Sequence, residues 1–156
     1  MRRLVTAAFG RRAEAELVDK LRDTEGFVPQ LSLVADNSGV ILGHVMFTRV
    51  TLESDPPAKV LALAPVSVYP AYQKRGIGSA LIRSGLAIAD ERGESLVVVL
   101  GQPEYYPRFG FVPASSLGIL SPWPDIPDDA FMVKPLSGYR DDMMGTVRYP
   151  PEFEET

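Results

Sequence analysis

The sequence predicts a single α/β domain, of the α+β type, with a mixed central sheet. Two apolar runs, at 60–68 and 96–100, have the nearly continuous hydrophobic pattern of buried strands. Between them, residues 79–92 have the spacing of an amphipathic helix. Two strands joined by a helix form a βαβ unit, so we expect parallel strands and a right-handed crossover.

Composition fits one folded domain over residues 1–156, because 46% of the residues are hydrophobic. The net charge of -4 argues against a nucleic-acid partner, since phosphate contacts need clustered Lys and Arg. With no cysteine, the chain has no thiolate nucleophile and no Cys-based metal site, and we expect no metal. No apolar run is long enough for a membrane span or a signal peptide. We therefore expect no membrane partner and a cytoplasmic location.

The elements before the βαβ unit are a helical region and a hairpin. Residues 2–22 carry an apolar stripe at helical spacing, and 31–36 and 40–52 are strand-like. The residues between these two strands, Asp36-Asn37-Ser38-Gly39, favour a tight turn. Inside the first buried strand, Pro65 cannot donate to a sheet ladder, so either pairing is interrupted there or the strand is an edge strand that ends.

After the crossover helix, Gly93 suits a helix C-cap. The second buried strand is followed by a short helix or turn, in which Pro103 suits a first helical position. A proline-rich stretch around Trp123 reads as a long loop, which in a compact domain is often functional. Residues 130–136 and 145–149 are strand candidates, and we expect the tail at 150–156 to fray.

The segment Gln73-Lys74-Arg75-Gly76-Ile77-Gly78 has the features of an anion-binding loop. The two glycines let successive N–H groups point outward at the positive end of the helix dipole, and Lys74 and Arg75 add positive charge. The third glycine of a dinucleotide fingerprint and the Gly-Lys-Ser/Thr of a triphosphate loop are both absent. On its own, the Gly-x-Gly is equally compatible with a tight strand-to-helix turn.

The loop fits the Gln/Arg-x-x-Gly-x-Gly/Ala pattern of the GNAT superfamily of N-acetyltransferases. Further on, Tyr105-Tyr106-Pro107-Arg108-Phe109-Gly110-Phe111 resembles the Tyr-x-x-x-Gly-Phe segment of that family, in the same order and at the same spacing. The resemblance covers roughly 4–136, and the closing residues resemble a little-characterised subgroup. It implies a GNAT-like domain whose βαβ core binds acetyl-CoA, with the pantetheine arm in a splay between the two parallel strands, at the point where Pro65 would permit a gap.

The resemblance also implies which residues bind the co-substrate. Backbone groups of the first buried strand would bond the pantetheine amides and polarise the thioester carbonyl, and the loop would hold the diphosphate. The residues concerned are Val66, Ser67, Val68, Gln73, Lys74, Arg75, Gly76, Ile77, Gly78 and Ser79. The expected reaction is direct attack by a primary amine in a ternary complex, without a covalent enzyme intermediate.

Tyr106 falls at the family's tyrosine and is our candidate proton donor to the thiolate, because a phenol stays protonated at neutral pH. The alternative is an aromatic side chain packed under the co-substrate. Pro107 restricts the residue before it, so Tyr105 could be the one that points inward. The general base is not identified, because residues 61–68, in the strand before the loop, contain no acid. The remaining candidates for the base are Glu104, His44 and water.

The expected function is transfer of an acetyl group from acetyl-CoA to a small-molecule amine or peptide acceptor. Trp123 and Phe131 would line the acceptor pocket or simply belong to the core, and Asp125, Asp128 and Asp129 would attract a cationic amine or simply be solvated. Arg108 would bind phosphate or have a structural role.

Two other functions remain open at this point: a non-catalytic acyl-CoA-binding or regulatory module, and a nucleotide-binding domain unrelated to CoA. The resembled family usually opens with a strand, whereas this sequence opens in the expected helical region. We expect that strand to be absent, supplied by another segment or lost to a misassigned start, and an uncovered sheet edge would favour a homodimer.

Overall fold

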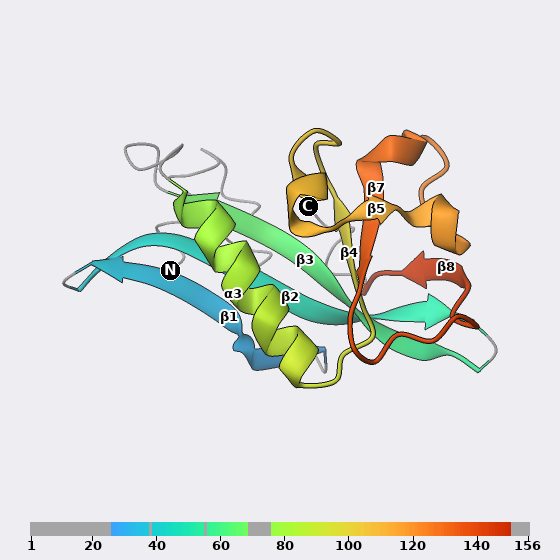
Figure 1. Cartoon of the computed structure of the whole chain (residues 1–156), viewed down its shortest axis with the longest axis horizontal. Coiled ribbons are helices and arrows are strands. Elements are labelled where there is room, and N and C mark those ends of the chain that lie inside the picture. The colour runs from blue at the N-terminus through green and yellow to red at the C-terminus, as the bar shows by residue number, and fades with distance from the viewer. Residues whose placement is uncertain (1–25, 38, 55, 69–75, 151–156) are drawn as a thin grey trace. The chain divides into compact units, whose positions relative to one another are not determined.

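The computed structural model describes residues 26–37, 39–54, 56–68 and 76–150 (Figure 1). The expected helical region at 2–22, the tail from 151 onward and the loop residues Gln73, Lys74 and Arg75 lie outside these ranges. The described elements, in order, are β1 (Phe27–Asn37), β2 (Val40–Glu53), β3 (Ala58–Val68), α3 (Ile77–Glu91), β4 (Leu96–Leu100), η2 (Tyr106–Phe109), β5 (Val112–Pro113), η3 (Ala114–Leu117), β6 (Ile119–Leu120), η4 (Asp128–Ala130), β7 (Phe131–Pro135) and β8 (Gly145–Arg148).

The predicted βαβ unit is confirmed. β3 and β4 pair in parallel, with Leu61 opposite Val97 and Ala62 opposite Val98, and α3 connects them along the chain. Gly93 has φ +78° and its N–H donates to Asp90 O at 3.1 Å, so it ends the helix as expected.

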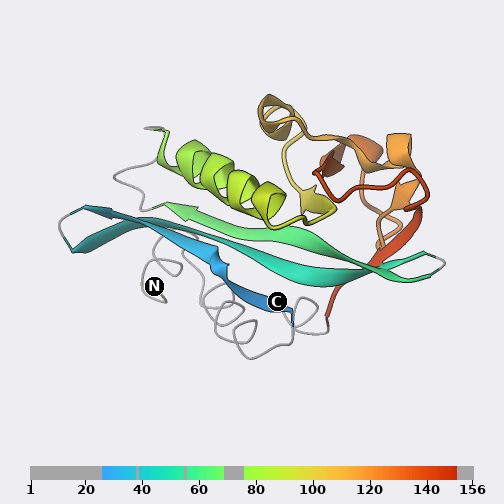
Figure 2. The same ribbon diagram turned by 60° about the horizontal axis from the view of Figure 1, so that its bottom comes forward.

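The chain folds into two compact units, and β2 and β3 run through both. In the first unit, β1 and β2 form the predicted antiparallel hairpin, and Figure 2 shows α3 lying along one face of the strands. Gly85 of α3 lies so close to β2 that a Cβ there would be 2.1 Å from Phe47 Cε1. The absence of a side chain at Gly85 therefore sets how closely the helix approaches the strand.

In the second unit, the strands lie in the order β5-β7-β4-β3-β2-β8-β6. β4 lies between β7, which is antiparallel to it, and β3, which is parallel, so the sheet is mixed as predicted. Four successive residues of β4, Leu96 to Val99, are buried, which explains its unbroken apolar pattern. The ladder between β4 and β7 ends with Leu100 opposite Phe131, at the carboxyl end of β4.

The expected short helix or turn after β4 begins as a turn at 103–105, which leads into the 3₁₀ helix η2. Pro103 therefore lies in the turn, and Pro107 lies in the first turn of η2, where a missing N–H leaves no bond unmade. Gly110, at φ +93°, ends this helix. The proline-rich stretch contains short elements, η3, β6 and η4, that were not predicted because two to four residues are too few to show a period.

Candidate active site

The start of α3 has the backbone geometry of an anion site. Gly76 has φ +82°, and a Cβ at this position would meet nothing within 4 Å. The first helical bond runs from Ala80 N to Gly76 O at 2.9 Å, so the N–H groups of Ile77 and Gly78 lie in the first turn of the helix, ahead of its first internal bond. The first turn of α3 contains no acidic residue, and its positive dipole end suits a phosphate.

The other residues that we expect to bind the co-substrate lie on β3. It continues past its paired residues Leu61 and Ala62 to Val68, and the backbone of Val66, Ser67 and Val68 is extended. Pro65 lies inside this strand, ahead of these three residues. Because proline donates no N–H, the ladder bond that its amide would make is absent.

Tyr106 lies at the carboxyl end of β4. Its ring packs on Gly101, where an added Cβ would be 2.3 Å from Cε2 of the ring. The ring of Phe111 meets that of Tyr106 edge to face, with centroids 5.8 Å apart. Gly101 in turn donates its N–H to Ala130 O at 3.0 Å, which ties this position to the start of β7. Tyr106 therefore stands on a glycine that is fixed by the sheet.

The two tyrosines of the motif have different surroundings. Tyr105 lies under Arg108, whose guanidinium carbon is 4.6 Å from the ring centroid and whose Nε donates to Tyr105 O at 3.0 Å. Arg108 is exposed and has a structural role of the kind expected. Burial, and then the charge of the neighbouring Tyr105, raises the pKa of Tyr106 to about 12. Tyr106 therefore keeps its proton at any physiological pH.

The two side chains considered as bases differ in access. His44 on β2 has no exposed surface, and its Nε2 lies 3.1 Å from Ser32 Oγ. Glu104 is exposed, just before η2. Of these two, only Glu104 can exchange a proton directly with solvent.

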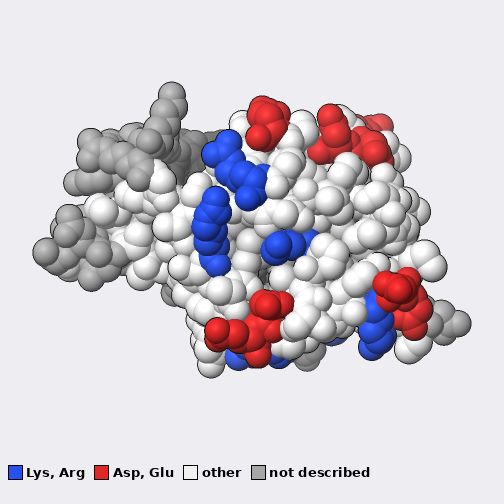
Figure 3. All heavy atoms as spheres, in the orientation of Figure 1, with Lys and Arg blue, Asp and Glu red and all other residues white. Residues whose placement is uncertain are grey.

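A cavity of about 280 Å³ lies among η3, β6 and η4. Trp123 and Phe131 both line it, and Asp128 is the one carboxylate among its lining residues, which include no Lys or Arg. Figure 3 shows acidic side chains gathered over η4, where Asp128 and Asp129 form the first turn. The sequence-predicted acceptor residues Trp123, Phe131 and Asp128 are thus brought together.

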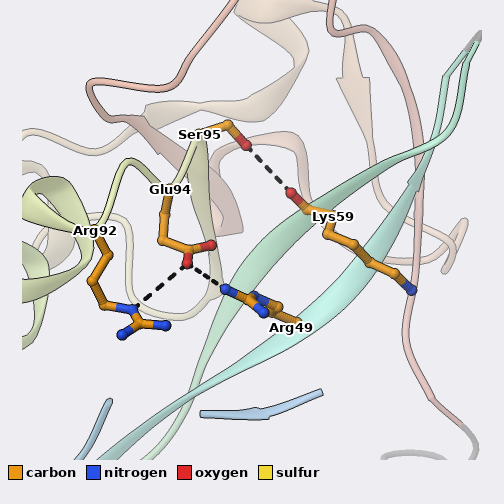
Figure 4. Close-up of polar contacts among 5 residues, drawn as sticks. All are labelled: Arg49, Lys59, Arg92, Glu94 and Ser95. Carbon is orange, nitrogen blue, oxygen red and sulfur yellow. Dashed lines mark hydrogen bonds and ion pairs between the residues drawn. The ribbon is translucent and has the colours of Figure 1, made fainter. Parts of the chain in front are cut away.

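The amino end of β4 carries a polar cluster that sequence reasoning missed. Glu94 is 9% exposed, and its Oε2 accepts from Arg49 Nη2 at 2.7 Å and lies 3.9 Å from Arg92 Nε (Figure 4). Ser95 Oγ donates to Lys59 O at 3.4 Å beside them, while the Lys59 ammonium points away from Glu94 (Figure 4). Arg49 and Glu94 are 45 residues apart, so no local pattern marks them. The Arg49–Glu94 pair thus lies at the amino end of β4, and Tyr106 lies at its carboxyl end.

Metal sites and membrane-spanning helices are both absent from the part of the chain that the structure describes. Within 26–37, 39–54, 56–68 and 76–150, no three potential metal ligands gather into a group. In the same ranges, no helix is both long enough and apolar enough to cross a membrane.

Known proteins resemble this chain over most of its length. The family model described as an acetyltransferase (GNAT) domain matches residues 1–114. The Escherichia coli K12 protein YjhQ, named an uncharacterized N-acetyltransferase, is 38% identical over 153 residues, which cover 95% of this chain and 84% of YjhQ. YhbS of the same strain, with the same kind of name, is 32% identical over 152 residues, covering 97% and 87% of the two chains.

Two solved structures are similar in fold as well. The crystal structure of E. coli YhbS in complex with CoA matches with a TM-score of 0.85 and 32% identity, over 98% of this chain and 84% of that one. A GNAT family acetyltransferase from Brucella melitensis in complex with acetyl-CoA matches with a TM-score of 0.77 and 35% identity, over 97% and 88% of the two chains.

Proposed function

Because this chain belongs to the GNAT family of acetyl-CoA-dependent acetyltransferases, we propose that it transfers the acetyl group of acetyl-CoA directly to a primary amine, with Tyr106 assisting the departure of the thiol. The observation that carries this proposal is the position of Tyr106: a half-buried phenol held on Gly101 at the carboxyl end of β4. In open α/β sheets, ligands bind at the carboxyl ends of the strands.

The described part of the loop fits a diphosphate. Gly76 leaves open space where a side chain would stand, and the N–H groups at the start of α3 lie at the positive end of the helix dipole. Lys74 and Arg75 would add charge, and Gln73 would complete the loop. On β3, the backbone of Val66 and Val68 would bond the pantetheine amides, beyond Pro65 and past the two residues that pair with β4.

The reaction needs three contributions from the protein. Acetyl-CoA supplies an activated thioester: as an N–C bond forms to the amine, the C–S bond breaks and CoA leaves as the thiol. The N–H of Val66 or Ser67 would stabilise the negative charge that develops on the carbonyl oxygen. Tyr106 would donate its phenolic hydrogen to the departing sulfur, and the proton that the amine loses would restore the phenol through solvent.

The raised pKa of Tyr106 limits how it can act. With a pKa of about 12, full proton transfer to a thiolate whose acid has an ordinary pKa near 8.5 would be uphill by about 5 kcal/mol. Tyr106 would therefore act through a hydrogen bond that strengthens as charge builds up on sulfur, and transfer would be completed only as the amine loses its proton. Tyr106→Phe removes this bond while keeping the ring on Gly101.

The amine must be neutral when it attacks, and the base is the least defined part of the proposal. Glu104 is exposed near η2 and could accept the proton directly or through water. His44 is a poorer choice because it has no exposed surface. An unchanged pH–rate profile in His44→Ala would agree with this assignment.

A thiol-release assay with acetyl-CoA and a panel of primary amines tests the function. We expect release that depends on the amine, and an increase in melting temperature on adding CoA. A non-catalytic acyl-CoA-binding module would be stabilised by CoA but release no thiol with any amine. Stabilisation by ATP or NAD and not by CoA would contradict the proposal altogether.

A further inference from the structure

We propose that the cavity lined by Trp123 and Phe131 binds the apolar body of the acceptor, so that the preferred substrates are primary amines with an aromatic ring or a branched aliphatic group. This inference rests on the proposed acetyl transfer and names the class of amine. The cavity, of about 280 Å³, has an apolar wall and one carboxylate at its edge. We name this cavity the Trp123 pocket.

The Trp123 pocket lies at the end of β4 that carries Tyr106. Phe131, one of its walls, pairs with Leu100 as the last step of the β4–β7 ladder. The next residue, Gly101, bonds Ala130 at 3.0 Å and supports the ring of Tyr106. Ala114, another lining residue, comes three residues after Phe111, which also contacts Tyr106. Phe131 and Ala114 therefore both connect to the proposed acid through two or three intervening residues.

The aromatic wall is held in place from outside the pocket. The ring of Tyr149 stacks on Trp123, with centroids 4.8 Å apart and planes at 30°. Trp123 N also donates to Ser121 Oγ at 3.0 Å. A ring that is fixed before the ligand arrives loses little entropy on binding, which favours a binding role for this pocket.

The charge of the Trp123 pocket suits an ammonium group at its mouth. Asp128 lines the pocket and is exposed, as are the neighbouring Asp125 and Asp129. Another cavity of this unit, at the amino end of β4, is lined by Arg49, Lys59, Arg92 and Arg140 beside Glu94, so it repels a cationic amine. Acidic residues raise the local concentration of a cation, and an indole face attracts it further.

Size narrows the class of acceptor. Pockets for drug-sized ligands run from about 300 to 1,000 Å³, so a cavity of about 280 Å³ takes a single ring or a short branched chain. The apolar side chains Ile119, Ile126 and Phe131 offer few polar partners for a hydroxyl or a second ammonium. Polyamines and amino sugars should therefore be poor acceptors.

The test compares kcat/KM for 2-phenylethylamine and 3-methylbutylamine with that for ethanolamine and putrescine. We expect the two apolar amines to be preferred by at least about tenfold, the order that apolar contacts give in a pocket. Trp123→Ala should remove most of this preference while leaving the KM for acetyl-CoA unchanged. Ser115→Phe, at an exposed lining residue, should fill the pocket and act in the same way without disturbing the contact with Tyr149.

The charge is tested separately. Asp128→Asn should raise the KM for 2-phenylethylamine by about two- to fivefold, with a smaller effect in high salt. Asp142→Asn is the matched control: it removes an exposed carboxylate that pairs with Arg140 and does not line the Trp123 pocket. It should leave that KM unchanged.

The outcomes separate this inference from the proposed function. Acetylation of amines with no preference for the apolar ones overturns the inference alone. So does an apolar preference that survives both Trp123→Ala and Ser115→Phe. A protein that binds acetyl-CoA but acetylates none of the amines overturns the inference and the proposed function together.

Discussion

Gly101→Ala should disable the enzyme by displacing Tyr106. A Cβ at residue 101 would lie 2.3 Å from Cε2 and 2.9 Å from Cδ2 of the ring, where ordinary contacts begin near 3.4 Å. The ring must therefore retreat by about 1 Å. A displacement of that size can lower the rate by about a hundredfold, and overpacking costs about 1 to 3 kcal/mol of stability.

The assay is kcat for thiol release at saturating acetyl-CoA, with the best amine of the panel. If displacement of Tyr106 is the cause, Gly101→Ala should lower kcat much less when Tyr106→Phe is already present. Gly85→Ala is the control, because its Cβ would be 2.1 Å from Phe47 Cε1 and would overpack the protein away from Tyr106. It should lose comparable stability and keep its kcat. A folded Gly101→Ala variant with wild-type kcat would refute the reasoning.

Three further predictions concern the loop, the polar cluster and the buried phenol. Gly76→Ala should weaken CoA binding at least about fivefold in isothermal titration, because a side chain is strained at φ +82°. Gly39→Ala is the control: it is equally strained, at φ +87° in the hairpin turn, and should leave CoA affinity unchanged. An equal loss of CoA affinity in both variants would contradict the assignment of the loop. In urea, Glu94→Gln should lower the free energy of unfolding by about 1 to 3 kcal/mol, whereas Arg148→Gln, which breaks an exposed pair with Glu53, should cost less than about 1. Above pH 10, Tyr106 ionises in the unfolded chain, while in the folded protein it keeps its proton until about pH 12. The free energy of unfolding should therefore fall by up to about 3 kcal/mol as the pH rises through this range, and Tyr106→Phe should remove this contribution to the fall.

The sequence predicted the central fold because its signals are local. The apolar residues 96–100 are buried along the strand that they predict, and the turn residues at 36–39 join two antiparallel strands. β1 begins at Phe27, four residues earlier than expected, because Pro29 and Gln30 separate Val28 from the apolar pattern that starts at Leu31. β2 ends one residue later than expected, at the polar Glu53. β5 and β6, of two residues each, depend on pairing with β7 and β8 rather than on any pattern of their own.

The site was predicted less completely, because parts of it depend on contacts across the sheet. The motif could not decide between Tyr105 and Tyr106; the contact with Gly101, which lies outside the motif, is our reason for proposing Tyr106. No local pattern marks Glu94, because its partner Arg49 lies 45 residues away on β2. By contrast, Trp123 and Phe131 were chosen from residue type alone, and they do line one pocket.

The most direct test of the account is the turnover of Tyr106→Phe beside that of Tyr105→Phe, at saturating acetyl-CoA and amine. Both variants remove one phenolic oxygen from neighbouring residues and keep the ring. The account predicts that Tyr106→Phe loses about tenfold or more in kcat, because the departing sulfur loses its hydrogen-bond donor, and that Tyr105→Phe stays near the wild-type value. Wild-type turnover in Tyr106→Phe, with the loss in Tyr105→Phe instead, would contradict it.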